Sequence, residues 1–294
     1  MELLSPQNFA DYELIDCGGF EKLERWGKYI TIRPEPQALW DKVLSEKEWE
    51  KQAHVRFVSK SSSAGTWEKL KREMPDQWKV SYNIKDGGKS RITCRLGLTS
   101  FKHVGIFPEQ APNWDYIYKN LKAAQAPKPK FLNLFAYTGA ASLAARAAGA
   151  DVTHVDSIKQ VVTWSKENMD HSGLSDIRWV VEDAMKFVKR EVKRGNKYNG
   201  IILDPPAFGH GPDGESWKLE KNINEMVKLV LELLDEKEHF LILNTYSLGF
   251  SSLIIENFLS AKAGKKLQTG ELFLPATSGV VLPLGVFGRF SNIK

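Results

Sequence analysis

FLNLFAYTGAASLAARAAGA, residues 131–150, decides the fold class of this 294-residue chain. Its apolar start is typical of a buried strand, the residues around Gly139 form a small-residue turn, and its alanine-rich end favours a helix. A strand, a tight turn and a helix in this order build a nucleotide-type pocket in open α/β sheets. The stretch therefore predicts an α/β fold.

The same alternation continues towards the C-terminus. Strands are expected near 131–135, 152–156, 177–181, 199–203 and 239–244. Helices are expected near 140–148, 158–170, 184–193, 217–235 and 251–261. This order predicts a mostly parallel sheet covered by helices on both faces. The last two apolar runs, joined by a short loop at 277–279, predict a closing antiparallel pair.

The first hundred residues show short strands joined by glycine turns. Gly18-Gly19 marks one turn, residues 28–33 alternate as a strand, and Asp86-Gly87 separates two alternating runs as in a hairpin. Residues 36–57 and 67–74 are interpreted as helical. We therefore expect a small, mixed, strand-rich domain at 1–105 and a larger α/β domain at 106–294.

The segment between these two parts predicts a helix followed by a connector. Apolar residues from Pro112 onwards recur near helical spacing, and QAPKPK at 125–130 ends the pattern because its two prolines stop regular structure.

Composition excludes several classes of protein. Cys17 and Cys94 are too few for a disulfide framework or a four-cysteine metal site, and the histidines lack the spacing of metal ligands. No signal peptide or membrane span is predicted, so we expect a cytoplasmic protein without a bound metal. A net charge of +5 fits a polyanionic partner as well as ordinary solubility. Tryptophans interleaved with basic residues before residue 120 would suit nucleic acid or simply fill a small core.

Acidic residues follow three of the predicted parallel strands. Asp156, Asp183 and Asp204 each stand at a carboxyl end, where ligands bind in such sheets. An acid after the second strand suits ribose hydroxyls, and one after the third suits an adenine amine. FAYTGAAS keeps only Gly139 of the GxGxxG pattern, and the chain has no GxxxxGK[ST] loop, which disfavours NAD and ATP. A nucleoside with a carboxylate and no phosphate, such as S-adenosylmethionine, fits better.

Two motifs resemble those of class I S-adenosylmethionine-dependent methyltransferases. LNLFAYTG at 132–139 and DPPAF at 204–208 are most similar to bacterial ribosomal RNA large-subunit methyltransferases with LNLFxYTG and DPPxF motifs. The resemblance covers about two thirds of the chain and implies a Rossmann-like catalytic domain at 106–294, bound S-adenosylmethionine and an RNA substrate such as ribosomal RNA.

The resemblance also assigns cofactor-binding residues. Phe135, Tyr137 and Gly139 would line the methionine part, Asp156 would bind the ribose, and Asp183 with Ala184 would meet the adenine. VGIFPEQ at 104–110 resembles a family segment ending in Asp-Gln, which makes Gln110 a candidate contact and leaves Glu109 in place of the aspartate. The remaining candidate cofactor residues are Asn133, Thr138, Ser157 and Asp204.

The candidate catalytic residues are Asp204, Pro205, Pro206 and Phe208. Methyl transfer depends mainly on holding the reacting atoms in line, so the protein positions more than it activates. The two prolines would stiffen the loop, Asp204 would accept from a target amine and Phe208 would stack on a base. Two prolines after a strand also suit a loop that has only a structural role. In amine methyltransferases of the NPPY type the aromatic residue follows the second proline directly, whereas Ala207 stands between them here. The identity of the methylated atom therefore stays open.

The chain has no cysteine after Cys94. Methylation of cytosine at carbon 5 needs a thiolate that adds to the base. We therefore expect transfer to a nitrogen or an oxygen, unless Cys17 or Cys94 reaches the site.

Residues 209–222 are expected to form a long polar loop, in the place of a substrate lid. There His210 is either a substrate contact or a solvated side chain, and Trp217 either stacks on a base or fixes the next helix. Two alternatives stay open for the whole chain: a methyltransferase acting on a protein or small molecule, and a non-catalytic nucleic-acid-binding protein with the same fold. A dehydrogenase is disfavoured by the missing glycines.

Overall fold

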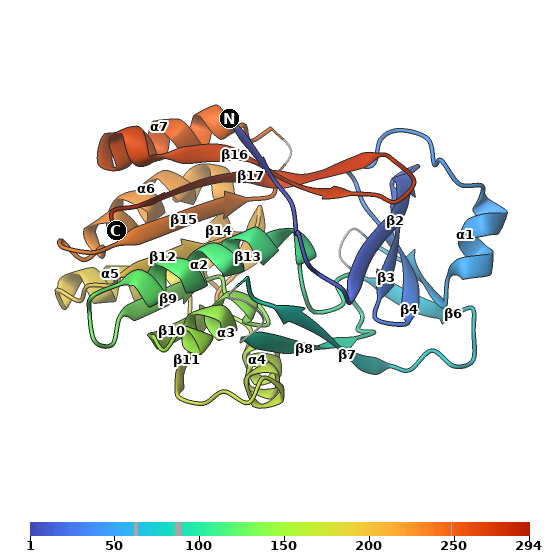
Figure 1. The fold of residues 1–294 in the computed structure, drawn as a ribbon, viewed down its shortest axis with the longest axis horizontal. Helices are drawn as coiled ribbons and strands as arrows, with labels where there is room; N and C mark the ends of the chain where they lie inside the picture. The colour runs from blue at the N-terminus through green and yellow to red at the C-terminus, as the bar shows by residue number, and fades with distance from the viewer. Residues whose placement is uncertain (62–63, 86–89, 248) are drawn as a thin grey trace.

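The computed structural model describes residues 1–61, 64–85, 90–247 and 249–294 (Figure 1). Over these residues its largest sheet has eight strands in the order β1-β16-β17-β15-β12-β9-β10-β11. The strands are β1 Glu2–Leu4, β9 Lys130–Leu134, β10 Asp151–Asp156, β11 Ile177–Val181, β12 Gly200–Leu203, β15 Phe240–Thr245, β16 Gln268–Pro275 and β17 Val281–Ser291. Strands β15, β12, β9, β10 and β11 are parallel, and β17 is antiparallel to both β15 and β16. The predicted fold class and closing pair are confirmed.

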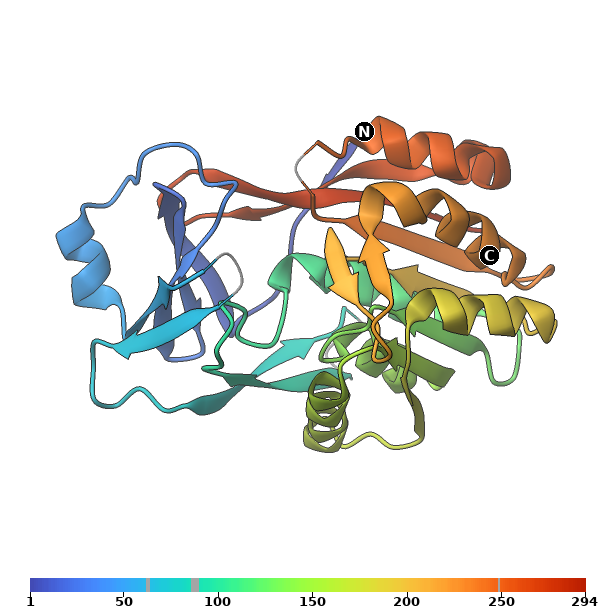
Figure 2. The ribbon, with the colours of Figure 1, turned by 180° about the vertical axis from the view of Figure 1, so that it is seen from behind.

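Helices cover both faces of this sheet, as Figures 1 and 2 show together. One face carries α2 Ala111–Ala123, α3 Ala140–Ala147 and α4 Lys159–His171. The other face carries α5 Ala184–Lys193, α6 Leu219–Glu232 and α7 Ser252–Ala263. Strand β12, with the sequence GIIL, is buried along its whole length because both of its sides are covered. The expected helices of this half are confirmed, with boundaries within a few residues.

A second sheet is built from β2 Tyr12–Gly18, β3 Glu21–Trp26, β4 Tyr29–Pro34, β5 Val55–Ser59 and β6 Gly65–Lys69. The strand expected at 28–33 is β4. The turn expected at Gly18-Gly19 joins β2 to β3, and Gly19 takes a φ of 57°, which glycine adopts without steric cost.

The helices predicted for 36–57 and 67–74 are largely wrong. Only α1 Glu46–Gln52 is helical in the first segment, and it begins at a capping box made by Ser45 and Glu48. The end of that segment is β5, and the second segment starts in β6. Phe57 and Trp67 pack across this strand pair with ring centroids 5.1 Å apart. Cross-strand packing thus outweighs the helix propensity of the surrounding Glu and Lys residues.

A hairpin links the two halves of the molecule. Strands β7 Gln77–Asn83 and β8 Arg91–Gly97 pair antiparallel as expected, while the predicted Asp86-Gly87 turn lies outside the described residues. The backbone N–H of Thr93 donates to Ser172 Oγ (2.9 Å), and that of Arg95 donates to Asn168 Oδ1 (2.7 Å). Strand β8 is therefore bonded along α4.

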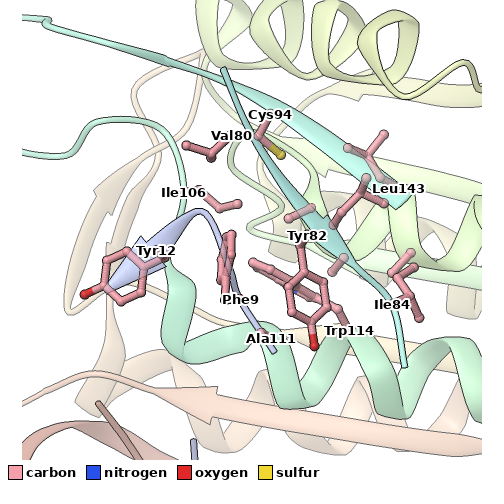
Figure 3. Close-up of a cluster of buried hydrophobic side chains, with 14 of the residues drawn as sticks. Phe9, Tyr12, Val80, Tyr82, Ile84, Cys94, Ile106, Ala111, Trp114 and Leu143 are labelled. Carbon is pink, nitrogen blue, oxygen red and sulfur yellow. The ribbon is translucent and has the colours of Figure 1, made fainter. Parts of the chain in front are cut away.

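The hydrophobic core under this hairpin contains residues from both halves (Figure 3). Tyr82 of β7 packs edge-on against Phe9, with ring centroids 5.1 Å apart, and against Trp114 of α2 at 5.3 Å. The strand-rich part and the helix-covered sheet share these side chains, so each part buries apolar surface of the other.

The hairpin β16–β17 makes a second link (Figure 1). Its turn reaches the second sheet, where Ala276 forms a bridge with Leu14 and Ser278 Oγ donates to Asp16 Oδ1 (2.7 Å). Among the described helices, none combines the length and the apolar character that a membrane crossing requires.

Candidate active site

The turn after β9 has an unusual backbone. Phe135, Tyr137 and Gly139 have φ values of 55°, 50° and 89°, so two residues with side chains occupy the left-handed region. Non-glycine residues in that region are strained and are held only by their surroundings. Asp156 Oδ2 accepts from the N–H of Tyr137 (2.9 Å), and Ser165 Oγ donates to its carbonyl (2.7 Å). The end of β10 and helix α4 thus fix the shape of the turn.

Buried polar side chains support this turn from the protein interior. Asn133 Nδ2 donates to Ser142 Oγ (2.9 Å), which lies 3.1 Å from His154 Nδ1. Burial lowers the pKa of His154 to about 3, so its ring is neutral. Thr138 is also buried, and its hydroxyl donates to the carbonyl of Gly105. Among the candidate cofactor residues, Asn133 and Thr138 therefore form part of the support of the turn.

Asp156 and the residues after it form an edge of the site. Its Oδ1 accepts from the N–H of Ile158 (3.0 Å), and burial raises the pKa of its carboxyl. Ser157 follows directly. Ile158, two residues beyond the end of β10, and Val181, the last residue of the adjacent strand β11, are 51% and 42% exposed. Exposed aliphatic side chains at this position offer apolar contact to a flat ring.

Sequence reasoning missed Ile158 and Val181. A signal was available for Ile158, which precedes α4 at the N-cap position without a side-chain cap. A polar residue is favoured at an N-cap, so an apolar residue in that position indicates a role other than capping the helix.

Asp183 caps helix α5. Its Oδ1 accepts from the N–H of Lys186 (2.9 Å), and Ala184 begins the helix as a buried residue. Gly211 lies so close that a side-chain carbon there would be 3.0 Å from Asp183 Cβ. Glu215 forms an ion pair with Lys186 of α5. This pair and the close approach of Gly211 hold residues 211–215 against the start of α5.

Asp204 is held from two sides. Its Oδ1 accepts from Asn244 Nδ2 (2.9 Å), and its Oδ2 accepts from Gln110 Nε2 (3.2 Å). Gln110 is itself oriented by Asn113, which donates to its side-chain oxygen (2.9 Å). Burial raises the pKa of Asp204 to about 6. The structure thus brings together two residues predicted from separate motifs, and it adds Asn113 and Asn244, which the sequence reasoning did not select.

The loop expected at 209–222 is mostly regular structure, and this prediction was wrong. Strands β13 Phe208–His210 and β14 Ser216–Lys218 form a hairpin that leads into α6 (Figure 2). Trp217 is buried, its Nε1 donates to the carbonyl of Pro206 (2.7 Å), and its ring lies 4.8 Å from that of Phe135. It therefore holds the proline loop, residues 204–208, against the turn after β9, a contact that neither sequence interpretation of Trp217 anticipated.

The proline loop ends in an exposed aromatic residue. Phe208 is 68% exposed, and Lys218 Nζ lies 6.0 Å from the centre of its ring. His210, two residues along the same strand, is also exposed. A flat apolar ring beside a cation is the combination that stacks bases and binds phosphates.

Neither cysteine is a nucleophile in this structure. Cys17 and Cys94 are buried, and burial raises the pKa of each thiol to about 12. Across the described ranges, no group of three or more His, Cys, Asp or Glu side chains is arranged to hold a metal ion.

The residues at these strand ends fit a nucleoside that carries an amino acid. The turn 135–139 contains no Lys or Arg for a phosphate, Asp156 presents a carboxylate suited to ribose hydroxyls, and Ile158 with Val181 exposes apolar surface. A solved structure of an S-adenosylmethionine-dependent methyltransferase from Agrobacterium tumefaciens is 36% identical to this chain. The match covers 99% of this chain and 93% of the other, with a TM-score of 0.90. This chain belongs to the S-adenosylmethionine-dependent methyltransferases. It is therefore an enzyme of that family, and S-adenosylmethionine is its cofactor.

Other comparisons cover parts of this methyltransferase. Residues 115–245 match the family described as conserved hypothetical protein 95. The ribosomal RNA large subunit methyltransferase K/L of Shewanella frigidimarina is 32% identical over 144 residues, which is 48% of this chain and 19% of that protein. The corresponding protein of Pseudoalteromonas translucida is 34% identical over 119 residues, or 40% of this chain and 16% of that protein. The chain thus spans about a fifth or less of the length of these curated relatives.

The structure of SMU.776, complexed with SAH, supports the fold. It is 20% identical, covers 97% of this chain and 76% of its own, and has a TM-score of 0.71.

Proposed function

We propose that this methyltransferase modifies a nitrogen or oxygen atom of structured RNA, such as ribosomal RNA. The observation that carries the proposal is the half-buried carboxyl of Asp204, held by Gln110 and Asn244 at the start of a proline loop that ends in exposed Phe208. The similarity of about half of the chain to ribosomal RNA methyltransferases supports the choice of RNA. A loop with one acceptor and one exposed ring suits a flat base that carries a hydrogen-bond donor.

We propose that the turn after β9 and the ends of β10 and β11 hold the cofactor. Phe135, Tyr137 and Gly139 would surround its methionine part, and Asp156 with Ser157 would bind its ribose. Asp183, Ala184 and the two exposed aliphatic side chains would enclose its adenine. When bound, the cofactor supplies an electrophilic methyl group on a positively charged sulfur.

The side chains of the proline loop would position the acceptor. Asp204 accepts a hydrogen bond from it, Phe208 stacks on the base, and Pro205 and Pro206 limit motion of the loop. Because the carbonyl of Pro206 is bonded to Trp217, this loop is also tied to the turn that would bind the cofactor. Holding both reactants on one rigid unit is the main means of accelerating such a transfer.

Transfer to carbon 5 of a pyrimidine is disfavoured by the two cysteines. That reaction needs a thiolate. Both thiols are buried with pKa values raised to about 12, which leaves them protonated at neutral pH. A heteroatom acceptor does not need a nucleophilic side chain.

We further propose that residues 1–105 contribute substrate recognition to this RNA enzyme, which would act in the cytoplasm. Tyr29 and Trp67 are partly buried aromatic residues of that part, and Lys28 lies 5.2 Å from the Tyr29 ring. Cations beside aromatic rings favour single-stranded nucleic acid.

Transfer of label tests the substrate. Purified protein is incubated with tritiated S-adenosylmethionine and either total RNA or a protein extract from a strain that lacks the gene. We expect label in RNA, and mass spectrometry of digested RNA would then identify the methylated nucleoside. Label confined to the protein extract would contradict the RNA proposal and favour a protein methyltransferase.

A further inference from the structure

A groove on the α2 face of the molecule lies outside the methyl-transfer site. It has a volume of about 860 Å³, and its walls come from the N-terminal segment, the chain just after β7, helix α2 and the strands β16 and β17. Figure 1 views this face, with the N-terminal segment in dark blue and α2 in green. Among the described residues that line the groove, none is a candidate cofactor or catalytic residue. The groove is therefore a separate feature of the molecule.

Arg289 of β17 lines this groove as a buried cation, with only 8% of the residue exposed. Its guanidinium donates through Nε to Gln268 Oε1 (2.9 Å) and through Nη1 to the carbonyl of Pro112 (3.5 Å), and both acceptors are neutral. Burial lowers the pKa of the guanidinium, and Tyr116 and Glu2 oppose that shift without forming an ion pair with it. Within the described part of the chain, Nη2 has no hydrogen-bond partner. A buried charge without a counter-charge is unfavourable, so a negatively charged ligand is expected beside it.

The other charges of the groove are mostly positive. Three exposed lysines that form no ion pair with any described residue also line it: Lys85, Lys119 and Lys122. The one acid among the described lining residues is Asp115. Its Oδ2 accepts from the Tyr82 hydroxyl (2.8 Å), and its Oδ1 accepts from the backbone N–H of Lys85 (2.9 Å). The groove therefore carries an excess of cations, which favours a polyanionic ligand.

Two tyrosines of α2 lie beside these cations. The guanidinium carbon of Arg289 lies 4.3 Å from the centre of the Tyr116 ring, and Lys122 Nζ lies 5.6 Å from the centre of the Tyr118 ring. Stacking on a ring holds a planar guanidinium in one orientation, and its fork of N–H donors matches the oxygens of a phosphate. Cations interleaved with aromatic rings are typical of surfaces that bind nucleic acid.

The length of the groove distinguishes a strand from a single nucleotide. The groove follows α2 from Pro112 to Ala123, which is roughly 16 Å at the helical rise of about 1.5 Å per residue. A stacked strand advances only about 3.4 Å per nucleotide, so several successive phosphates fit within this length. The same helix also leads to the reaction site, because Pro112 lies two residues after Gln110, which donates to Asp204 (3.2 Å).

We propose that this groove binds backbone phosphates of the RNA substrate, outside the nucleotide that is methylated. Arg289 is the buried phosphate contact, and Lys119 and Lys122 are the exposed ones. The inference rests on the proposed RNA substrate and adds a second place where that RNA is held. A free nucleotide also carries a phosphate, but the row of cations along α2 fits a strand.

Binding of ribosomal RNA at several salt concentrations tests the groove. The RNA comes from a strain that lacks the gene. The double variant Lys119→Gln/Lys122→Gln should bind this RNA about tenfold more weakly and lower the slope of log affinity against log salt by about one to two, because fewer counterions are released. The matched control is Lys228→Gln/Lys262→Gln, which removes the same charge from exposed positions of α6 and α7 on the opposite face. It should bind within about twofold of the wild-type protein, and equal losses in the two double variants would overturn the proposal.

Substitutions at Arg289 test the buried contact. Arg289→Gln should weaken RNA binding by about tenfold, and Arg289→Lys should restore part of it, because lysine keeps the charge and loses the fork. Denaturant titration shows whether each variant is folded. If Arg289→Gln is unfolded, the two lysines of α2 decide the outcome.

Two further results separate this proposal from its alternatives. RNA that takes up the tritium label but binds the groove variants like the wild-type protein would overturn the groove and leave RNA methylation standing. A wild-type protein that neither binds nor labels RNA would overturn both. Uridine 5′-monophosphate should not displace RNA at micromolar concentrations, and displacement that is lost in Lys119→Gln/Lys122→Gln would assign the groove to a free nucleotide instead.

Discussion

Gly139 shows how one residue couples the backbone to the site. It has a φ of 89°, and a side-chain carbon there would lie 3.3 Å from Ser165 Cβ and 3.4 Å from His154 Cε1. Gly149 has a similar φ of 94° but open space around it. Substitutions at the two glycines can therefore distinguish the effect of backbone strain from the effect of crowding beneath the turn.

Gly139→Ala should lower the free energy of unfolding by about 1–2 kcal/mol, because alanine is strained in the left-handed region. Crowding should also shift the turn and weaken S-adenosylmethionine binding by about tenfold, an effect of the ~1.4 kcal/mol that a displaced contact costs. Denaturant titration and calorimetry measure the two effects. Gly149→Ala should lose comparable stability with normal binding, and normal binding in both variants would contradict the assigned role of the turn.

Asp204 predicts a pH dependence. Burial raises its pKa to about 6, so the carboxylate that accepts the hydrogen bond forms above that pH and is lost below it. The wild-type transfer rate should therefore fall as pH decreases through about 6.

Asp204→Asn should reduce the rate by about 10²–10³-fold at pH 8, the scale seen when one positioned group is removed from an active site. Its rate should no longer respond to pH near 6. Single-turnover assays and calorimetry provide the measurements, and a variant with a normal rate would remove Asp204 from the reaction.

At the scale of elements, the hairpin β13–β14 connects the proline loop to the turn after β9. Trp217 joins the carbonyl of Pro206 to the ring of Phe135. Trp217→Phe keeps the ring packing but leaves that carbonyl unpaired, which should cost about 1–2 kcal/mol of unfolding free energy and lower the transfer rate severalfold.

Trp78→Phe is the control for that substitution. The buried Nε1 of Trp78 has no hydrogen-bond partner in the described residues, so removing this group should lower the free energy of unfolding by less. Equal losses of stability in the two variants, measured by denaturant titration, would show that the bond to Pro206 contributes nothing.

The elements of the large sheet could be predicted because their pattern is local. The parallel strands between residues 131 and 245 are mostly apolar runs bounded by turn residues, and acids at the strand ends marked Asp156, Asp183 and Asp204. The second sheet could not be predicted as well. Residues 36–57 and 67–74 are rich in Glu, Lys and Trp, which suit a helix, and only the pairing of Phe57 with Trp67 shows that the first segment ends in a strand and the second begins in one.

The remaining site residues depend on partners far apart in sequence. Gln110 reaches Asp204 across 94 positions, and Tyr246 donates to Glu35 across 211. No local pattern signals such pairs. The motif VGIFPEQ indicated Gln110, but the buried charges of the second sheet can be identified only in the folded chain.

At the scale of the whole molecule, the hairpin β7–β8 belongs to the core of the large sheet. Its strand β8 is bonded to Ser172 and Asn168 of α4, and Tyr82 lies in the shared core. A fragment 77–294 should therefore unfold at a higher denaturant concentration than a fragment 106–294, because the shorter piece exposes that core. Equal midpoints for the two fragments would place the division between the halves at residue 105.

The most direct test replaces Asp204 by Asn at the chromosomal locus and quantifies all modified nucleosides of total RNA by mass spectrometry. One methylated nucleoside should be lost from a specific RNA position, with the variant protein present at its normal abundance. A nucleoside profile identical to that of the wild-type strain, at the same protein abundance, would contradict RNA methylation at Asp204.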